Sequence, residues 1–499
     1  MIGITPIPEF YANKDVLITG STGFIGKVLI EKLLRSCSQI NRIFILVRSK
    51  RGKSAVDRIK EFQECPLFEK LLESNPKILD KLIPVIGDVL SLGLGLSNSD
   101  KKLMENVSII FHSAASVRFD DPLKEAILMN TRGTREMLEF AMTLEKLKVF
   151  LHVSTTYCNA DHRVIEEKIY PPHADWRKTI EIAEKLDSEL LDILCPKYSD
   201  NLPNTYIFTK GLSENACDDY KTKVPICIFR PAVVVGVMRE PLPGWVANFN
   251  GPAGLLVGAG SGILRAFCCD INCPLYCTPA DTCVNAIIVA AWKKAQNLDK
   301  EILPIYNCAT GKSSVGELTG EIMQDAAAEY PLSAAFWTVN GELTTSKTYF
   351  FFLNILFHFL PGLLIDTILK LSGRPPMLLK LQRKITAAGA ALQYFVTKTF
   401  DMRCENFVNL VDCILPEDRP NFTFDVSDKH LDRRKFMFDQ VKAGRIYLLK
   451  DPLSTIPAAK RKMKILNALD FTLKFIILPL ILYFIFGFKI KHVFQHYFT

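Results

Sequence analysis

The 499-residue sequence lacks several features that would assign it to common functional classes. It has no long run of Lys and Arg with interleaved aromatic residues, although its formal net charge is +8, so nucleic-acid binding is not expected. The first 20 residues have neither the charged start nor the apolar core of a secretory signal peptide. We therefore expect a protein of a reducing, cytosol-facing compartment.

The 14 cysteines lack the spacing of a disulfide framework or a metal site. Five of them gather in one stretch, at Cys268, Cys269, Cys273, Cys277 and Cys283. None of these pairs has C-x-x-C spacing, and no His lies nearby. Buried or partly buried thiols are expected here, and no metal.

A glycine-rich turn between an apolar run and a helical pattern is the first positive signal. Residues 16–19 (VLIT) are followed by GSTGFIG, which places glycines at 20, 23 and 26. In dinucleotide-binding folds such glycines permit a tight turn, admit a pyrophosphate to the backbone and let helix and strand pack closely. The phosphates then lie at the N-terminus of the helix. The expected contacts are Gly20, Ser21, Thr22, Gly23, Phe24, Ile25 and Gly26.

Apolar runs alternate with helical patterns until about residues 307–311. The further expected strands are residues 43–48, 82–88, 107–116, 149–156 and 224–231. This alternation predicts an α/β fold with a doubly wound, Rossmann-like parallel sheet. Ligands bind outside the carboxyl ends of such strands, so the residues that follow the strands are expected to share one rim.

Several residues on this expected rim are assigned to the cofactor. They are Arg48, Arg51, Asp88, Ala114, Ala115, Asn130, Arg230 and Pro231. A site that prefers NAD usually carries an acid after the second strand, where this chain has Arg48, Lys50 and Arg51. This basic cluster suits the 2′-phosphate of NADPH; the alternative is a solvated run of charge.

Two Tyr-x-x-x-Lys pairs occur, Tyr206 with Lys210 and Tyr394 with Lys398. The composition gives roughly two Tyr-x-x-x-basic pairs by chance, so the spacing alone carries little weight. The first pair lies between the fifth and sixth expected strands. The second lies in a Phe- and Leu-rich segment beyond the alternating region and is interpreted as an ordinary helix face.

The first pair and the end of the fifth strand supply the groups that reduction of a carbonyl requires. Tyr206 is the expected proton donor, with a pKa that Lys210 lowers toward neutrality, and Lys210 also holds the ribose. Ser154 or Thr155 hydrogen-bonds the carbonyl oxygen, with Thr155 favoured. The segment between Thr155 and Tyr206 is expected to be an insertion with a helix that covers the substrate.

Several long stretches resemble the fatty acyl-CoA reductases of the extended short-chain dehydrogenase/reductase group, with alcohol-forming animal and insect members most similar. These stretches are VLITGSTGFIGKVLIEKLLRS, IIFHSAASVRFDD, FLHVSTTY, PNTYIFTKGLSE and EPLPGWVANFNGPAGLLVGAGSGILR. In the second half, FLPGLLIDTILKLSGRPPMLLKLQRKI is similar to the C-terminal domain of that family. The family usually has R-P-S after the sixth strand, where this chain has Arg230, Pro231 and Ala232.

The resemblance implies two NADPH-dependent reductions without an acyl-enzyme cysteine. A long-chain fatty acyl-CoA gives an aldehyde and free CoA, and the aldehyde gives a primary alcohol. Three alternatives stay open: reduction that stops at the aldehyde, an extended short-chain reductase acting on a sterol or a nucleotide sugar, and an NADPH-binding protein without catalysis. The sequence leaves the chain-length preference and the oligomeric state open.

The expected domains are a reductase domain over residues 1–340, a mainly helical domain over 341–455 and a membrane anchor over 465–488. The uncharged part of the anchor is short, and its extension admits Asp470 and Lys474, which are spaced to form a pair or to lie in the interface. Basic residues at 460–464 favour a cytosolic catalytic part on a peroxisomal or endoplasmic reticulum membrane.

A second uncharged stretch, residues 349–365, is interrupted by Pro361 and Gly362. It can form core, line an acyl channel or make a membrane-facing hairpin. Core or channel lining is ranked ahead of a membrane span.

Overall fold

The computed structural model of the chain describes residues 4–48, 55–200, 202–298, 301–309, 312–427 and 432–477. The contacts divide the chain into two compact units. Unit 1 comprises Met1–Ala247, Asn272–Ser314 and Ala391–Phe436, and unit 2 comprises Asn248–Ile271, Val315–Ala390 and Met437–Thr499. Each unit is thus assembled from three segments. The domain boundaries expected at 340 and 455 remain a prediction, because these units reflect compactness and not independent folding.

Unit 1 contains a seven-stranded parallel sheet with the strand order β11-β7-β5-β4-β1-β2-β3. Its strands are β1 Asp15–Thr19, β2 Arg42–Val47, β3 Leu82–Ile86, β4 Val107–His112, β5 Val149–Val153, β7 Ile226–Pro231 and β11 Ile305–Cys308. Every pairing between neighbouring strands is parallel. The predicted doubly wound α/β fold is confirmed, and the order reverses at β1, where ligands bind in such sheets.

The edge strand β11 is the one strand of this sheet that the sequence analysis missed. It has four residues, all buried, and it pairs in register with β7, for example Ile305 with Ile228. A run of four residues that includes Asn307 shows no clear alternation, so only its pairing identifies it as a strand.

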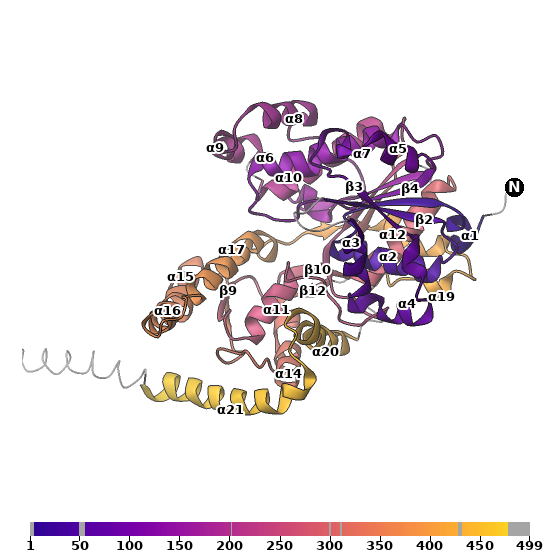
Figure 1. Cartoon of the computed structure of the whole chain (residues 1–499). Coiled ribbons are helices and arrows are strands. Elements are labelled where there is room, and N and C mark those ends of the chain that lie inside the picture. The colour runs from indigo at the N-terminus through magenta and orange to yellow at the C-terminus, as the bar shows by residue number, and fades with distance from the viewer. Residues whose placement is uncertain are drawn as a thin grey trace, which may run out of the picture. The chain divides into compact units, whose positions relative to one another are not determined.

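Helices cover both faces of the sheet (Figure 1). On one face lie α7 (Gly133–Ala141) and α10 (Thr205–Tyr220), and on the other lie α2 (Phe24–Ser36) and α12 (Ala280–Ala295). The chain enters α7 through α6 (Leu123–Ala126) and a π-helical turn over Ile127–Arg132. Asn130 lies in this π-helical turn, which is wider than an α-helix.

The insertion before Tyr206 contains two helices where one was expected, α8 (Trp176–Lys185) and α9 (Ser188–Tyr198). The Asp192 carboxylate accepts the amide hydrogen of Leu123 at 2.8 Å, and the Trp176 indole donates to Asp219 at 2.8 Å. The insertion therefore packs against α6 and α10. Its role as a substrate cover stays a prediction.

Unit 2 is mainly helical, as expected, with one two-stranded sheet of β9 (Ala266–Cys268) and β13 (Glu342–Thr344). Its longest helices are α16 (Leu360–Leu371), α17 (Leu378–Val396) and α21 (Ile456–Thr472), and α15 (Lys347–Asn354) leads into α16. The last residues of α17 belong to unit 1. A short π-helical segment, Leu473–Ile477, follows α21, and the rest of the expected anchor lies outside the described residues.

The stretch around Pro361 differs from its prediction in two respects. The helix is continuous over the 25 residues Lys347–Leu371, because a π-helical turn over Ile355–Phe359 precedes Pro361, which lacks an amide hydrogen. The stretch is also not core, since Phe352 is 61% exposed and Leu364 is 63% exposed. This helix is long and apolar enough to cross a membrane.

Candidate active site

The glycine turn after β1 is too crowded for side chains at two of its three glycines. Gly20 has a φ of +70°, and a Cβ there would lie 2.7 Å from the Ser113 carbonyl carbon. A Cβ at Gly26 would lie 2.3 Å from the Gly20 carbonyl oxygen. The turn therefore brings the main chain close to β4 and places Gly23 immediately before α2.

The start of α2 has the properties of a phosphate site. Gly23 gives the helix no side-chain cap, and the first turn carries no acidic residue, so free amides and the positive end of the dipole face outward. The Ser21 hydroxyl is buried and has no hydrogen-bond partner within the described part of the chain. Free amides, a positive dipole and an unpaired hydroxyl fit the pyrophosphate of a dinucleotide.

Three groups of predicted rim residues follow strands as expected. Arg48 is exposed directly after β2, while Lys50 and Arg51 lie outside the described residues. Asp88 follows β3, and one of its oxygens accepts the amide hydrogen of Leu90 at 3.0 Å. The amide of Ala114 donates to the Thr19 hydroxyl at 3.1 Å, which holds the segment with Ala115 against the glycine turn.

Asn130 is buried and holds the loop after β4 in place. Its amide oxygen accepts the amide hydrogen of Ser116 at 2.8 Å, and its nitrogen donates to the Thr209 hydroxyl at 3.0 Å. These bonds tie the loop to α10. They support a positioning role for Asn130.

The Arg230 guanidinium is fully buried and turned away from the rim. It forms an ion pair with Glu214 at 2.6 Å and donates to the Lys168 carbonyl at 2.8 Å. Arg230 was assigned to the cofactor from its position near the end of β7. Since these protein partners engage the Arg230 guanidinium, it is not free to contact a cofactor, and the assignment of Pro231 stays a prediction.

Tyr206 lies in the first turn of α10, which begins after an Asn204 cap. The Thr155 side chain lies near enough to the Tyr206 hydroxyl to lower its pKa. Burial nevertheless raises the pKa of the phenol, the Cys158 thiol raises it further, and Thr155 opposes this only in part. The predicted fall in this pKa toward neutrality is therefore wrong. The phenol is protonated at neutral pH, which is the state that a proton donor requires.

The Lys210 ammonium is bound at the end of β5. Its Nζ donates to the Val153 carbonyl at 2.7 Å and lies 3.2 Å from Nε2 of His152. Burial lowers the pKa of Lys210 to about 8, against the opposing charge of Glu214. Lys210 shares α10 with Tyr206, but its ammonium contacts the strand end and the histidine.

Two buried histidines connect Lys210 with the strand that enters the glycine turn, and the sequence analysis missed both. The rings of His152 and His112 lie 5.4 Å apart, and Nδ1 of His112 lies 2.8 Å from the Thr19 hydroxyl. Burial lowers the pKa of His112 to about 3 and lowers that of His152 as well, so both are neutral. Their only sequence signal is a histidine in each of two apolar strands.

The two candidate hydroxyls, those of Ser154 and Thr155, have different neighbours. Thr155 contacts Tyr206, whereas the Ser154 hydroxyl points to the Cys158 sulfur at 3.9 Å. Thr155 also accepts the amide hydrogen of Tyr157 at 3.3 Å, which fixes its orientation. The contacts favour Thr155 as the partner of Tyr206.

An aromatic cluster borders Tyr206 within unit 1, and the sequence analysis did not assign it. The Phe119 ring lies 5.8 Å from that of Tyr206 and 5.6 Å from that of Phe395, which in turn lies 5.1 Å from Tyr157. Phe119 comes from the loop after β4 and Phe395 from the end of α17. Chain segments far apart in sequence thus give Tyr206 an apolar border suited to an acyl chain.

Both side chains of the second Tyr–Lys pair are engaged in contacts within the protein. The Tyr394 hydroxyl donates to the Ala160 carbonyl at 2.9 Å, and the Lys398 ammonium lies 3.9 Å above the Tyr394 ring. Lys398 follows the end of α17 at Val396. Tyr394 thus lies on a helix, as the sequence context indicated, whereas Lys398 lies just beyond its end.

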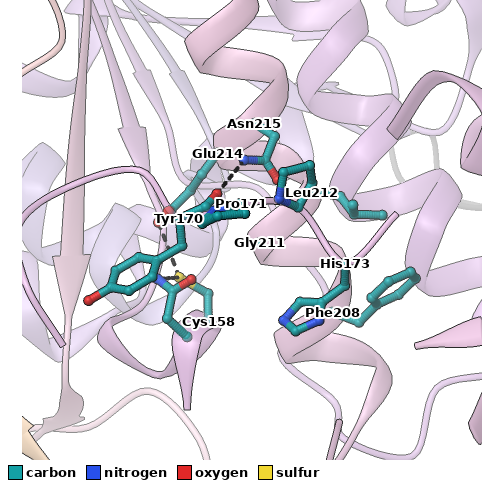
Figure 2. Close-up of a pocket in the computed structure, with 11 residues that line it drawn as sticks. Cys158, Tyr170, Pro171, His173, Phe208, Gly211, Leu212, Glu214 and Asn215 are labelled. Atoms are coloured by element: carbon teal, nitrogen blue, oxygen red, sulfur yellow. Dashed lines mark hydrogen bonds between the residues drawn. The ribbon is translucent and has the colours of Figure 1, made fainter. Parts of the chain in front are cut away.

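A hollow behind α10 is drawn in Figure 2. The Cys158 thiol donates to Glu214 at 3.2 Å there, and the Asn215 amide donates to the Tyr170 carbonyl at 3.1 Å. The residues that line it do not include Thr155, Tyr206 or Lys210. These contacts support α10 from behind.

The clustered cysteines are buried or partly buried, as expected. Cys268, Cys269, Cys273 and Cys283 are buried and Cys277 is half-buried. The Cys273 thiol donates to the Lys398 carbonyl at 3.1 Å. Over the parts of the chain that the structure describes, no group of three or more His, Cys, Asp or Glu residues is placed to hold a metal ion.

Two family models match the chain. An NAD-binding model described as "Male sterility protein" matches residues 18–287, and a second, Sterile, with the same description matches residues 357–451. The first spans the glycine turn and the sheet strands from β2 to β7. A nicotinamide cofactor is thereby confirmed at the level of the binding domain.

Solved structures share the fold at low sequence identity. The terminal R domain of the myxalamid biosynthetic pathway has a TM-score of 0.57 and 19% identity, covering 88% of this chain and 91% of its own. The reductase domain of a nonribosomal peptide synthetase from Mycobacterium tuberculosis has a TM-score of 0.57 and 19% identity, covering 90% and 94%. These likenesses support the Rossmann-like fold.

Curated relatives match almost end to end. Fatty acyl-CoA reductase 1 of Xenopus laevis is 37% identical over 479 residues, which cover 95% of this chain and 92% of the relative. The human protein of that name is 35% identical over the same shares, and Fatty acyl-CoA reductase wat of Drosophila melanogaster is 36% identical over 94% and 90%. With this identity over nearly the whole length, the chain belongs to the fatty acyl-CoA reductase family.

Proposed function

We propose that this protein reduces long-chain fatty acyl-CoA to a primary fatty alcohol, with NADPH as the reductant and free CoA as the second product. The observation that carries the chemistry is the position of Tyr206, near Thr155 at the end of β5 and beside the aromatic cluster. Two hydroxyls meet there at the end of β5, next to an apolar border and on the rim of the glycine turn. Family membership supports the substrate class.

The residues of this chain have distinct roles in a carbonyl reduction. A nicotinamide cofactor bound at the glycine turn supplies the hydride. Thr155 orients the Tyr206 hydroxyl and donates a hydrogen bond to the carbonyl oxygen as negative charge develops. Tyr206 then transfers its proton to that oxygen. Lys210, held by Val153 and His152, positions the ribose.

One site serves both reductions because each adds a hydride to a carbonyl carbon. In the first, the oxygen anion reforms a carbonyl as the carbon–sulfur bond breaks, and the thiolate of CoA takes up a proton. In the second, the aldehyde oxygen takes its proton from Tyr206 and remains a hydroxyl. Each step consumes one hydride and one proton, and neither requires a covalent bond to the protein.

The preference for NADPH is proposed from the segment after β2. Arg48 is exposed there, and the sequence continues with Lys50 and Arg51. A guanidinium matches the geometry of a 2′-phosphate and forms paired, charge-assisted hydrogen bonds with it. The sequence of residues 48–54 contains no Asp or Glu that could bind a free 2′-hydroxyl, which supports NADPH over NADH.

The membrane anchor is proposed from the C-terminal sequence, residues 465–488. Asp470, the one acid of its first part, is paired with Lys474 at 2.8 Å and with Arg265 at 2.9 Å, so its charge is neutralised. The basic residues at 460–464 would remain on the cytosolic side of a peroxisomal or endoplasmic reticulum membrane. An anchored enzyme meets a substrate whose acyl tail prefers lipid.

The test is a product balance with the detergent-solubilised full chain, palmitoyl-CoA and NADPH. We expect about two NADPH oxidised per CoA released, because each carbonyl reduction consumes one hydride, with hexadecanol as the lipid product. Release of no free thiol would refute the proposal and favour a sterol or another lipid carbonyl. One NADPH per CoA with accumulated aldehyde would limit the enzyme to the first step. Substitution of NADH for NADPH at equal rate would refute the assigned cofactor preference.

A further inference from the structure

The helix Lys347–Leu371 exposes large apolar side chains along its length. Phe352, Leu364 and Leu371 are 61%, 63% and 84% exposed. Phe351, Phe359 and Ile368 are exposed as well. A contiguous apolar surface of this length is unusual for a protein face that contacts water, and marks an interaction site.

The acid and the histidine within this helix, Asp366 and His358, are both buried and hydrogen-bonded by the protein. Both oxygens of Asp366 accept amide hydrogens at the start of α17, from Met377 at 2.9 Å, Leu378 at 2.8 Å and Leu379 at 3.0 Å. His358 is buried, and its Nε2 accepts the amide hydrogen of Arg265 at 2.9 Å. The exposed surface between Lys347 and Lys370 is therefore free of charge, which suits hydrocarbon.

The chain turns back immediately after this helix, and α17 packs against it. A Cβ at Gly362 would lie 2.9 Å from Leu379 and 2.8 Å from the Gln382 side chain, so the two helices are in close contact. In Figure 1, α15, α16 and α17 lie together in orange. If the helix crossed a bilayer, α17 would have to enter it too, with exposed Lys380 and Arg383. That is unfavourable, so the helix cannot be a simple span.

Exposed cations surround the turn of this hairpin. They are Lys370, Arg374, Lys380, Arg383 and Lys384. The one acid between residues 366 and 384 is Asp366, which is buried in its helix cap. An apolar face with cations beside it is the pattern of a helix that lies in the headgroup region of an anionic bilayer.

The hairpin is tied to the helix that leads into the proposed anchor, and the tie lies within unit 2. The Arg265 guanidinium bonds Asp470 of α21 at 2.9 Å and lies 4.8 Å from the ring of Phe357. The Trp337 indole also donates to Asp470. Arg265 thus joins α21 to the apolar helix through both its main chain and its side chain.

We infer that the helix Lys347–Leu371 embeds lengthwise in the surface layer of the anionic bilayer that the C-terminal segment enters, without crossing it. The partner is a lipid surface, recognised through apolar side chains and the cations of the hairpin turn. Unit 2 then has two membrane contacts joined by Arg265. The contact involves no catalytic group, so failure of the proposed reaction would not refute it, and its own failure would not refute the reaction.

Tryptophan quenching tests the position of the helix in the full chain. Leu364→Trp is compared with Ile193→Trp, since Ile193 is 72% exposed on α9 of unit 1. Both variants are reconstituted in vesicles of phosphatidylserine and brominated phosphatidylcholine. We expect extra quenching in Leu364→Trp only, stronger from bromines near the headgroup than from bromines near the chain end. Equal quenching in the two variants overturns the inference, and stronger quenching by the deep bromines shows a span instead.

Replacement of the hairpin cations by neutral glutamine tests whether their charge contributes to membrane binding. In the Leu364→Trp background, Lys380→Gln, Arg383→Gln and Lys384→Gln are combined and compared with Lys70→Gln, Lys101→Gln and Lys102→Gln, which are exposed in unit 1. We expect reduced quenching with the first triple in phosphatidylserine vesicles and no change with the second. Equal loss in both triples, or no loss in either, refutes a role for the hairpin cations. The Ile368→Trp variant replaces Leu364→Trp if the latter folds poorly.

Discussion

The two Tyr–Lys pairs have the same spacing but opposite environments. The Tyr206 hydroxyl contacts the Thr155 side chain, whereas the Tyr394 hydroxyl donates its hydrogen to the Ala160 main chain at 2.9 Å. Lys210 is buried against a strand end, whereas Lys398 lies 3.9 Å above an aromatic ring. The spacing therefore does not define a proton donor. A donor needs a partner hydroxyl that leaves its own hydrogen free for the substrate.

Loss of the phenolic hydroxyl should give the largest difference in activity between the two Tyr–Lys pairs. Tyr206→Phe removes the proposed proton donor, so kcat should fall by about 10²–10⁴ while NADPH still binds. Tyr394→Phe should retain activity within a few-fold. NADPH oxidation with palmitoyl-CoA measures kcat in both variants. Quenching of protein fluorescence by NADPH measures cofactor binding. Full activity of Tyr206→Phe would exclude this phenol from the mechanism.

Loss of the lysines should give the next largest difference. Lys210→Met leaves the Val153 carbonyl and His152 without their buried donor and removes the proposed ribose contact, so KM for NADPH should rise by at least about tenfold. Lys398→Met removes a cation above a ring and should leave KM unchanged. Initial rates at varied NADPH measure both. An equal effect of the two substitutions would contradict the comparison.

The pH dependence should follow Lys210 and not Lys398. The pKa of Lys210 is about 8 in the folded protein, lowered from 10.5 by burial, so the ammonium is lost above about pH 8. The rate at limiting NADPH should fall there, and Glu214→Gln should move the fall to lower pH, because the Glu214 charge raises this pKa. An unshifted profile in Glu214→Gln would exclude this coupling.

The same pKa shift affects stability. Between about pH 8 and 10.5 the unfolded chain binds the Lys210 proton and the folded chain does not. The free energy of unfolding should therefore gain a rising contribution across this interval, which Lys210→Met removes. Urea titrations at pH 7.5 and 9.5 would measure the difference, with Lys398→Met as the control. A similar pH dependence in both variants would contradict burial of the Lys210 ammonium.

The smallest expected effect is on stability, and it reverses the order of the two tyrosines. Tyr394→Phe removes a hydrogen bond to a main-chain carbonyl and should lower the free energy of unfolding by about 1 kcal/mol. Tyr206→Phe should cost less, because its hydroxyl makes no such bond to the main chain. Urea unfolding of the two variants gives the comparison. A larger loss in Tyr206→Phe would indicate a structural role for that phenol.

Much of the fold could be predicted because its strands are apolar, β-branched and separated by helical patterns. Six of the seven strands of the main sheet were located this way, and the glycine turn was identified with its flanking elements. β11 was missed because its four residues form no pattern without β7 beside them. Local sequence thus fixes elements, while pairing at a sheet edge depends on the assembled sheet.

The side-chain environments were harder to predict. The position of Arg230 near a strand end suggested a cofactor contact, but Glu214 on α10 draws its guanidinium inward. The pKa of Tyr206 was expected to fall, yet it rises because burial outweighs the effect of Thr155. His152 and Phe395 were missed since their partners come from distant segments. These properties depend on tertiary packing, which spacing in one helix does not report.

The tight turn at Gly20 and the side chain of Arg48 have different tasks in the proposed site. The turn binds the phosphates, and Arg48 selects between NADPH and NADH. The main chain at Gly20 and Gly26 has no room for a Cβ, and its proposed contact is with the phosphates that related dinucleotides share. Arg48 is an exposed side chain after a different strand. In the proposed site, an engineer can therefore leave the glycine turn intact and change the choice of reductant at a surface position, Arg48.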